Sequence, residues 1–282
     1  MPVFSALLLF FKIAGISAAS GICYRHNEVY IVADNSPYLY HYDFHESRLY
    51  KIQIDSSQIE ERVEKKYKAD FETLYDLDSV IVLVGSGSGP ERCKAFIYNK
   101  ARQKVEKVAL DALYDQMQKI GNIDTRNFNI EGISYADGVW YFLNRGNGNM
   151  HQNIVFTFRG NSMLRYLPET IQARHITLPP IGGCPSGFSD AQVLGNRLFF
   201  LATGEAKASN YEDGDNKGSF ISYLDLHTWK FGPIEQLSDT KKLEGLSLYS
   251  QSDNSVTFLL CEDPDDETIN SCPVYRYTYK MK

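Results

Sequence analysis

Residues 131–145 read EGISYADGVWYFLNR, and this stretch carries the pattern that decides the fold. A short run at 132–135 is followed by Ala136-Asp137-Gly138 and then by a run at 139–144 rich in aromatic residues. An Asp-Gly turn between two such runs is typical of a β-hairpin. Two further β-rich runs follow, so the segment predicts a four-stranded antiparallel sheet; they are residues 154–158 and 174–178.

Five segments of the chain share this pattern. Each begins at an acidic or small residue, passes through a turn into a β-rich run, and ends in a glycine-rich or acidic loop. The starting residues lie 52, 59, 59 and 54 residues apart, at Ser20, Glu72, Glu131, Asp190 and Glu244. In the first four segments the second run ends 14 residues after the start, and in the fifth it ends 18 residues after it. Four strands repeated every roughly 40–60 residues predict the blade of a β-propeller.

The two ends of the chain are predicted to form one blade together. The fifth segment supplies three strands, and the apolar run at residues 3–13 precedes the first segment. Pairing of this run with the last blade would remove an open sheet edge. We therefore predict an all-β protein, a single five-bladed β-propeller over residues 1–282, closed by the N-terminal strand. Six blades are the alternative.

Two connections between an outer strand and the next inner strand predict helices. One stretch begins with Asp55 and is apolar at every fourth position as far as Tyr67. The other begins at Asp111 and ends at Gly121.

The N-terminal run also allows a second interpretation. Its apolar core and the small residues 17–19 outline a secretory signal peptide, although no positive charge precedes the core. The strand interpretation leads us to expect a cytoplasmic protein, and a signal peptide would make it an exported one. The apolar run at 6–11 is too short to span a membrane, which needs about 20 residues. Of the five cysteines, Cys261 and Cys272 flank one polar loop and could form a local disulfide.

Composition narrows the class of protein. Apolar residues make up 43% of the chain and charged residues 23%, which is typical of a globular protein and not of a disordered one. The net charge is −6, so no overall positive field attracts nucleic acid. We expect a monomer whose partner is a small molecule or a protein.

Four carboxylates are predicted to surround one mouth of the central channel. The start of each inner strand and the end of the second strand are neighbours in an antiparallel hairpin, so their loops meet at one end. Like charges about 4 Å apart cost on the order of 4 kcal/mol at an effective dielectric near 20, so these acids need compensation. A cation, Arg145, protonation or backbone N–H groups could each supply it. The four residues are Glu72, Glu131, Asp190 and Glu244.

Three interpretations of these acids stay open. The carboxylates could lock neighbouring blades together by accepting backbone N–H groups. All four could instead bind a hard cation such as Ca²⁺, which takes six to eight oxygen ligands. Crowding could also raise the pKa of a catalytic acid or base, for which Glu131 and Glu72 are the candidates. Loops at the same mouth add candidate ligand-binding residues, namely Asp34, Ser86, Arg92, Arg145, Asn147, Asn149 and Glu262.

Three stretches resemble a known group of proteins. ASGICYRHNEVYIVADNSPYLY, FETLYDLDSVIVLVGSGSGPERCKAFIYN and NFNIEGISYADGVWYFLNRGNGNMHQNIVFTF are similar to an uncharacterised family of bacterial β-propellers. That family is distantly similar to esterase-like phytase and SdiA-regulated propellers. The resemblance covers nearly the whole chain and implies a propeller, but it brings no established catalytic residues.

The leading expectation for function is a ligand-binding or scaffold propeller with a Ca²⁺ ion at its acidic mouth. No G-x-S-x-G elbow leading into a helix and no P-loop occurs in the sequence. The alternative is a metal-dependent phosphoester hydrolase of the phytase or nucleotidase type. In that case Ca²⁺ would activate water, and Arg92 and Arg145 would hold the phosphate. A glycosidase with two carboxylates across a cleft is a third candidate. The sequence leaves open whether the protein is an enzyme.

Overall fold

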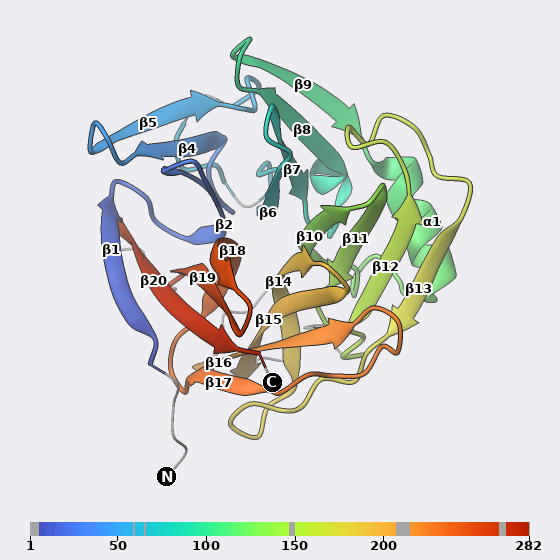
Figure 1. Cartoon of the computed structure of the whole chain (residues 1–282). Helices are drawn as coiled ribbons and strands as arrows, with labels where there is room; N and C mark the ends of the chain where they lie inside the picture. The colour runs from blue at the N-terminus through green and yellow to red at the C-terminus, as the bar shows by residue number, and fades with distance from the viewer. Residues whose placement is uncertain are drawn as a thin grey trace.

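Five sheets of four antiparallel strands surround a central axis, which makes the chain the predicted five-bladed β-propeller (Figure 1). The structure is a computed structural model, and it describes residues 6–58, 60–64, 66–146, 150–206, 215–264 and 269–281. In four blades the strand nearest the axis is followed along the chain by its three neighbours in order outward, and in blade 5 by two of its three.

Four blades are each built from one continuous segment. Blade 1 contains β2 (Ala19–Arg25), β3 (Glu28–Ala33), β4 (Tyr38–Asp43) and β5 (Arg48–Gln53). Blade 2 contains β6 (Phe71–Asp76), β7 (Val80–Gly85), β8 (Lys94–Asn99) and β9 (Lys104–Ala109). Blade 3 contains β10 (Ile130–Ala136), β11 (Val139–Asn144), β12 (Ile154–Arg159) and β13 (Ile171–His175). Blade 4 contains β14 (Ser186–Leu194), β15 (Arg197–Ala206), β16 (Asp215–Asp225) and β17 (Glu235–Ser238).

Blade 5 joins the two ends of the chain. Its first three strands are β18 (Leu243–Ser252), β19 (Ser255–Glu262) and β20 (Ser271–Lys280), and its outer strand is β1 (Leu8–Ala14). β1 pairs antiparallel with β20, from Leu8 opposite Arg276 to Ala14 opposite Ser271. Figure 1 shows the blue β1 beside the red β20. The predicted closure by the N-terminal strand is confirmed, although residues 3–5 of the predicted run lie outside the described part of the chain.

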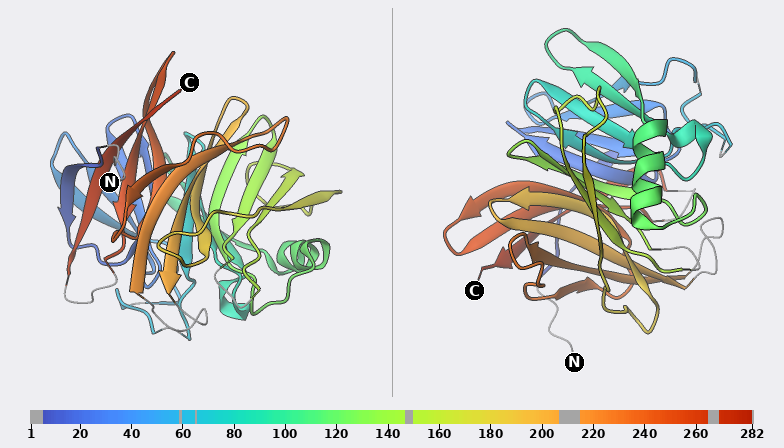
Figure 2. Two further views of the ribbon diagram at one scale, coloured as in Figure 1. Left: turned by 90° about the horizontal axis from the view of Figure 1, so that it is seen from below. Right: turned by 90° about the vertical axis from the view of Figure 1, so that its right-hand side faces the viewer.

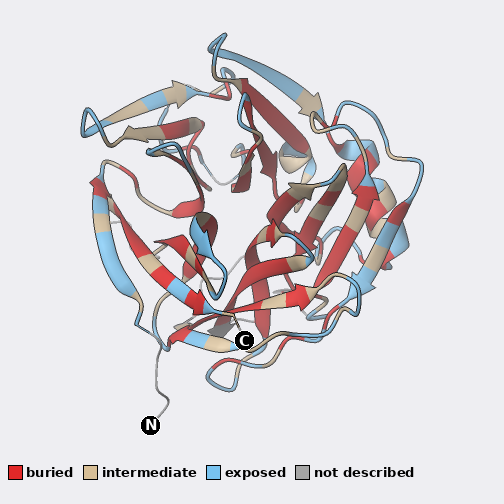
Figure 3. Cartoon of the chain, viewed as in Figure 1, coloured by how far each residue is buried: buried red, intermediate tan, exposed pale blue. Residues whose placement is uncertain are grey.

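Burial falls from the axis to the rim (Figure 3). The second strand β7, with the sequence VIVLVG, is buried at every position, whereas the outer strand β9, with the sequence KVEKVA, is largely exposed. Five hydrophobic clusters fill the interfaces between neighbouring blades. Fully buried rings such as Trp140 and Phe142 account for the high aromatic content, because wide blade faces need large side chains to fill the space between them.

One of the two predicted helices is present. Helix α1 spans Asp111–Gly121 and packs against β12 and β13 on the outside of the ring (Figures 1 and 2). The predicted helix from Asp55 to Tyr67 is wrong, because the described residues of that stretch form turns and bends. There the Val63 N–H donates to the carbonyl of Asn35, at 2.8 Å, in the loop after β3. This N–H is therefore bonded outside the segment and not within a helix. Within the described residues no helix is both long and apolar enough to cross a membrane.

Candidate functional site at the acidic mouth

A β-bulge lies near the start of every inner strand. The pairing with the second strand slips by one residue near this end of each blade, and such a bulge redirects its side chain relative to the sheet. The bulged positions are Ser20, Glu72, Glu131, Ser189 and Glu244. Asp190 therefore follows the bulge of its blade, and Ser189 is the structural counterpart of the three glutamates.

Asp190 connects three blades by hydrogen bonds. Its Oδ1 accepts hydrogen bonds from the Thr73 hydroxyl at 3.0 Å and from the Ala191 N–H at 2.8 Å. Its Oδ2 accepts the N–H of Leu246 on β18 at 2.7 Å. Burial raises the pKa of Asp190 well above its usual value even though these hydrogen bonds act in the opposite direction. Backbone N–H groups therefore compensate the Asp190 carboxylate, which is one of the alternatives that the sequence left open.

Hydroxyl groups connect further inner strands in the same way. The Thr73 Oγ1 accepts the N–H of Ile133 at 3.2 Å, the Ser134 Oγ accepts that of Val193 at 2.9 Å, and the Ser247 Oγ accepts that of Tyr24 at 2.8 Å. Each bond satisfies a backbone donor that would otherwise be unpaired at the inner edge of a blade. Together with Asp190, these side chains connect blades 2 to 3, 3 to 4, 4 to 5 and 5 to 1.

Arg145 is the counter-charge of two of the three glutamates. Its Nη1 lies 3.2 Å from Glu131 Oε2 and 3.5 Å from Glu244 Oε1, and all three side chains are buried. Its Nη2 donates to the Thr203 hydroxyl at 2.8 Å. A Cβ on Gly187 would come within 2.5 Å of the Arg145 Cγ, so a residue without a side chain is required where the arginine passes.

Each of the two glutamates also contacts a further nitrogen donor. The Asn129 amide donates to Glu131 Oε1 at 2.5 Å, and the Lys242 Nζ lies 3.2 Å from Glu244 Oε1. Glu131 therefore has hydrogen-bonding partners on both carboxylate oxygens, as expected for a structural ion pair in a buried setting.

A second charged group lies between blades 1 and 2, centred on Lys68. Its ammonium group binds the Asp34 Oδ2 and lies 2.7 Å from the Asp70 Oδ1. Burial alone would lower the pKa of Lys68, but the Asp70 and Asp34 carboxylates outweigh this effect and raise it. Asp70 adopts a left-handed backbone conformation with φ of 56°, which aspartate tolerates better than most residues.

Asp70 is the most heavily bonded carboxylate of this group. Its Oδ2 lies 2.7 Å from the Arg92 Nη1 and accepts the Ser86 hydroxyl at 2.5 Å. Burial would raise the pKa of Asp70, but Lys68 and Arg92 outweigh it and lower the pKa below its usual value. The structure thus brings together the predicted residues Asp34, Ser86 and Arg92.

Glu72 differs from every other acid at this mouth. Within the part of the chain that the structure describes, its carboxylate has no hydrogen bond and no ion pair. Burial raises its pKa well above the usual value, and the negative charges of Glu131, Asp70 and Asp34 raise it further, against the opposing effect of Lys68. This raised pKa favours protonation at Glu72, another of the predicted forms of compensation.

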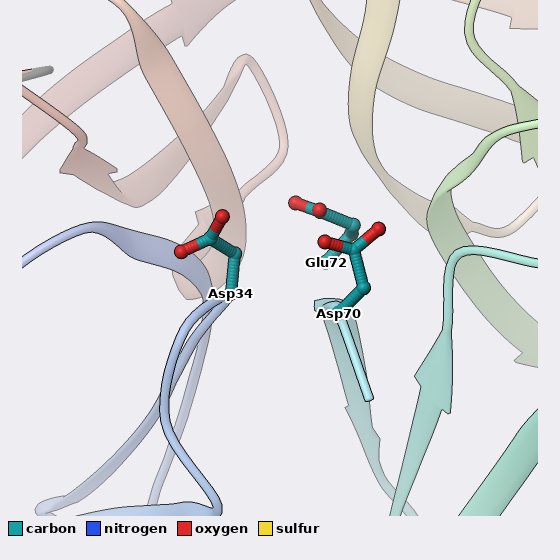
Figure 4. Close-up of side chains that lie close together, drawn as sticks. All are labelled: Asp34, Asp70 and Glu72. Carbon is teal, nitrogen blue, oxygen red and sulfur yellow. The ribbon is translucent and has the colours of Figure 1, made fainter. Parts of the chain in front are cut away.

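Asp34, Asp70 and Glu72 converge from the loop after β3 and the start of β6 (Figure 4). One oxygen from each lies within 4.8 Å of the others, and no other group of three or more acidic, histidine or cysteine side chains in the described ranges does so. Oxygens on one Ca²⁺ ion are about 2.3–2.6 Å from it and hence at most about 5 Å apart. These three oxygens meet that spacing.

The other predicted residues lie elsewhere. Glu262 binds the Lys241 Nζ at 3.1 Å and the Tyr275 hydroxyl at 2.5 Å, in a separate group of side chains on blade 5. Asn147 and Asn149 fall outside the described residues. The metal site formed by all four carboxylates stays a prediction. Asp190 accepts hydrogen bonds, Glu131 and Glu244 form ion pairs with Arg145, and Glu72 lies with Asp34 and Asp70.

Lys68 and Asp70 were not among the predicted site residues. In the sequence from 68 to 72, KADFE, both residues lie within four positions of the predicted Glu72, just before the inner strand β6 begins. That proximity is the signal that could have found them.

Comparisons with known proteins support the fold. Residues 15–275 match the profile of a protein family described as "Family of unknown function (DUF6929)". No curated protein matches the sequence. Glutaminyl cyclase from Myxococcus xanthus is similar in structure, with a TM-score of 0.56, 8% identity, and 99% of this chain and 100% of that chain covered. A luciferin-regenerating enzyme is also similar, with a TM-score of 0.50, 9% identity, and 99% and 95% covered. At such low identity the two structures are evidence for the propeller fold alone.

Proposed function

The chain belongs to the DUF6929 family, whose function is unknown, and we propose that it is a ligand-binding propeller that holds a hard divalent cation such as Ca²⁺. The proposed ligands are the carboxylates of Asp34, Asp70 and Glu72. The observation that carries this proposal is the convergence of the three oxygens within 4.8 Å around a glutamate that lacks a partner among the described residues.

The charge balance supports a cation at this position. Arg145 and Lys242 compensate Glu131 and Glu244, and Lys68 and Arg92 compensate Asp34 and Asp70. Asp190 has no cationic partner but accepts three hydrogen bonds, so among the described residues Glu72 is the acid of this group with neither a counter-charge nor a hydrogen bond. A divalent ion would neutralise it and would remove the repulsion that now favours its protonated form.

Lys68 would compete with a metal ion for the same carboxylate oxygens. Its ammonium group contacts Asp34 and Asp70, and a metal ion that used those oxygens would have to displace it. The side chain is long and flexible enough to move aside, since only the ammonium and not the backbone is held by the carboxylates. We therefore expect binding to be weaker than the number of carboxylates suggests.

Isothermal titration of the purified chain with Ca²⁺ tests the proposal. We expect one site on the wild-type protein, and a loss of at least about tenfold in affinity in Glu72→Gln, which removes one charged ligand at nearly constant size. Glu169→Gln is the matched control, because Glu169 is exposed on the loop between β12 and β13. Absence of Ca²⁺ binding to the wild-type chain would contradict the proposal, as would equal affinities in the two variants.

A metal-dependent phosphoester hydrolase, suggested by the resemblance to esterase-like phytases, has less support. The arginines that would hold a phosphate face carboxylates instead: Arg92 binds Asp70, and Arg145 binds Glu131 and Glu244. Turnover of p-nitrophenyl phosphate or phytate that requires Ca²⁺ would favour the hydrolase. The cytoplasmic location and the monomeric state stay predictions.

A further inference from the structure

A cavity of about 270 Å³ opens where four of the inner strands end. Because all five inner strands run in the same direction, this end of the axis is opposite the acidic mouth. Ala191 and Leu246, whose N–H groups bind Asp190, are among its lining residues. The Asp190 hydrogen bonds therefore lie at its floor and separate it from the carboxylates.

Three tyrosines are among the residues that line the cavity. Tyr24 and Tyr249 have ring centroids 5.0 Å apart, and Tyr75 lines the cavity from blade 2. The Tyr24 hydroxyl donates to the Asn27 side chain at 2.9 Å, and the Tyr75 hydroxyl donates to the carbonyl of Tyr135 at 2.8 Å. Since the Tyr24 and Tyr75 hydroxyls have acceptors elsewhere, these two rings offer a ligand mainly their carbon surfaces.

Gln192 contributes a side-chain amide to the same cavity. Its Nε2 donates to the carbonyl of Val193 at 3.3 Å, which uses one of its two hydrogens. The second hydrogen and the carbonyl oxygen have no other partner within the described residues. The amide can thus donate to and accept from a ligand at the same time.

The charges around this cavity compensate one another. Arg25 lies 3.1 Å from Asp78, and Asp76 lies 2.7 Å from Lys100. A charged ligand would have to break one of these pairs or remain without a counter-charge. The surroundings therefore favour a neutral ligand.

We propose that this cavity binds a single neutral sugar ring. The C–H face of a sugar would pack on the tyrosine rings, and its hydroxyl groups would pair with both functions of the Gln192 amide. The volume is below the range of about 300–1,000 Å³ that is usual for larger ligands, which limits the occupant to about one ring. A flat aromatic ring without polar groups would leave the amide unsatisfied.

Saturation-transfer NMR with glucose, galactose, mannose and N-acetylglucosamine tests the proposal, with phenol and indole as aromatic probes. We expect saturation transfer to at least one of the sugars. Gln192→Leu should weaken its binding by about tenfold, the effect of losing neutral hydrogen bonds. Gln236→Leu on β17 is the matched control, and Tyr249→Leu tests the ring surface independently of the amide.

The same experiment separates this proposal from the cation site. Glu72→Gln should leave the sugar signal unchanged, because the Asp190 hydrogen bonds lie between the two sites. Failure of every sugar to receive saturation at millimolar concentration would overturn the proposal. So would an unchanged signal in Gln192→Leu, or binding of phenol or indole in the absence of sugar binding.

Discussion

Glu72 determines how the proposed cation site should respond to pH. Burial and the neighbouring carboxylates raise its pKa well above the usual value, so a proton has to leave before the oxygen can bind a metal ion. Affinity for Ca²⁺ should therefore continue to rise with pH above the range in which an ordinary glutamate has already lost its proton. Titrations at several pH values measure this, and Glu72→Gln should remove most of the dependence. An affinity that fell as the pH rose would contradict the assignment of Glu72 as a ligand.

The same glutamate should lower the stability of the metal-free protein at high pH. A group whose pKa is raised on folding contributes stability below its unfolded pKa, and that contribution is lost as the pH rises through its folded pKa. Glu72→Gln should consequently increase the free energy of unfolding at neutral pH and have less effect at acidic pH. Urea denaturation in EDTA at both pH values checks this. A variant less stable than the wild type at neutral pH would show that Glu72 makes a stabilising contact.

Lys68 should oppose metal binding. Removal of its ammonium group in Lys68→Met frees the Asp34 and Asp70 oxygens, so Ca²⁺ affinity should increase while the metal-free protein becomes less stable. Titration calorimetry and thermal unfolding in EDTA measure the two effects. Lys119→Met, at an exposed position of α1, is the control. A decrease in affinity in Lys68→Met would indicate that the lysine supports the site and does not compete with the ion.

Sequence reasoning located the acids at this scale but could not tell how each one is compensated. It offered Arg145, protonation, backbone amides and a cation as alternatives. The structure shows Arg145 at Glu131 and Glu244, amides at Asp190, and a raised pKa at Glu72. Which form of compensation each acid has depends on contacts between side chains that are far apart in the sequence, such as Arg145 and Glu244, about 100 positions apart. No local sequence pattern predicts such contacts.

The inner strands show how a slip of one residue changes the role of a side chain. The alignment of the five repeats placed Asp190 at the position of the glutamates because it is acidic, but the bulge in β14 lies at Ser189. Side chains alternate along a strand, so a one-residue offset turns Asp190 toward Thr73 on blade 2 and Leu246 on blade 5. The strands and the hairpins could be predicted from periodicity, whereas the position of each bulge could not.

Asp190 should accordingly matter for stability and not for cation binding. In Asp190→Asn one of the two carboxylate oxygens becomes an NH2 group, which cannot accept a hydrogen bond. One buried backbone donor, the N–H of Leu246 or that of Ala191, would therefore lose its acceptor. We expect a loss of about 1–3 kcal/mol in the free energy of unfolding. Ser134→Ala removes a comparable acceptor from Val193 and should cost a similar amount. Urea denaturation measures both variants, and a loss of Ca²⁺ affinity in a folded Asp190→Asn would instead support the ring of four carboxylates.

The whole ring depends on a strand contributed by the other end of the chain. β1 covers the edge of β20, so its removal would expose unpaired N–H and C=O groups along the last blade. Deletion of residues 1–14 should lower the thermal stability and promote self-association, measured by calorimetry and size-exclusion chromatography. Deletion of residues 1–6 stops before β1 and should behave like the full chain. Equal stability of the two truncated chains would show that closure by β1 contributes little.

At this scale the sequence predicted most of the architecture, because repeated hairpins and their spacing determine the number of blades. The helix predicted after Asp55 was wrong, since the hydrogen bond from Val63 to Asn35 lies between segments that are distant in the sequence. Local periodicity contains no information on such tertiary hydrogen bonds. The side chains that meet at the two ends of the axis likewise follow from the assembled ring and not from any single blade.

Anomalous diffraction from crystals of the full chain grown with Ca²⁺, or soaked with Tb³⁺ as its substitute, tests the central claim most directly. We predict one strong peak within coordination distance of Asp34, Asp70 and Glu72, with the Lys68 ammonium displaced from between the two aspartates. A peak between Glu131 and Glu244 would contradict this account, as would the lack of any peak at the acidic mouth.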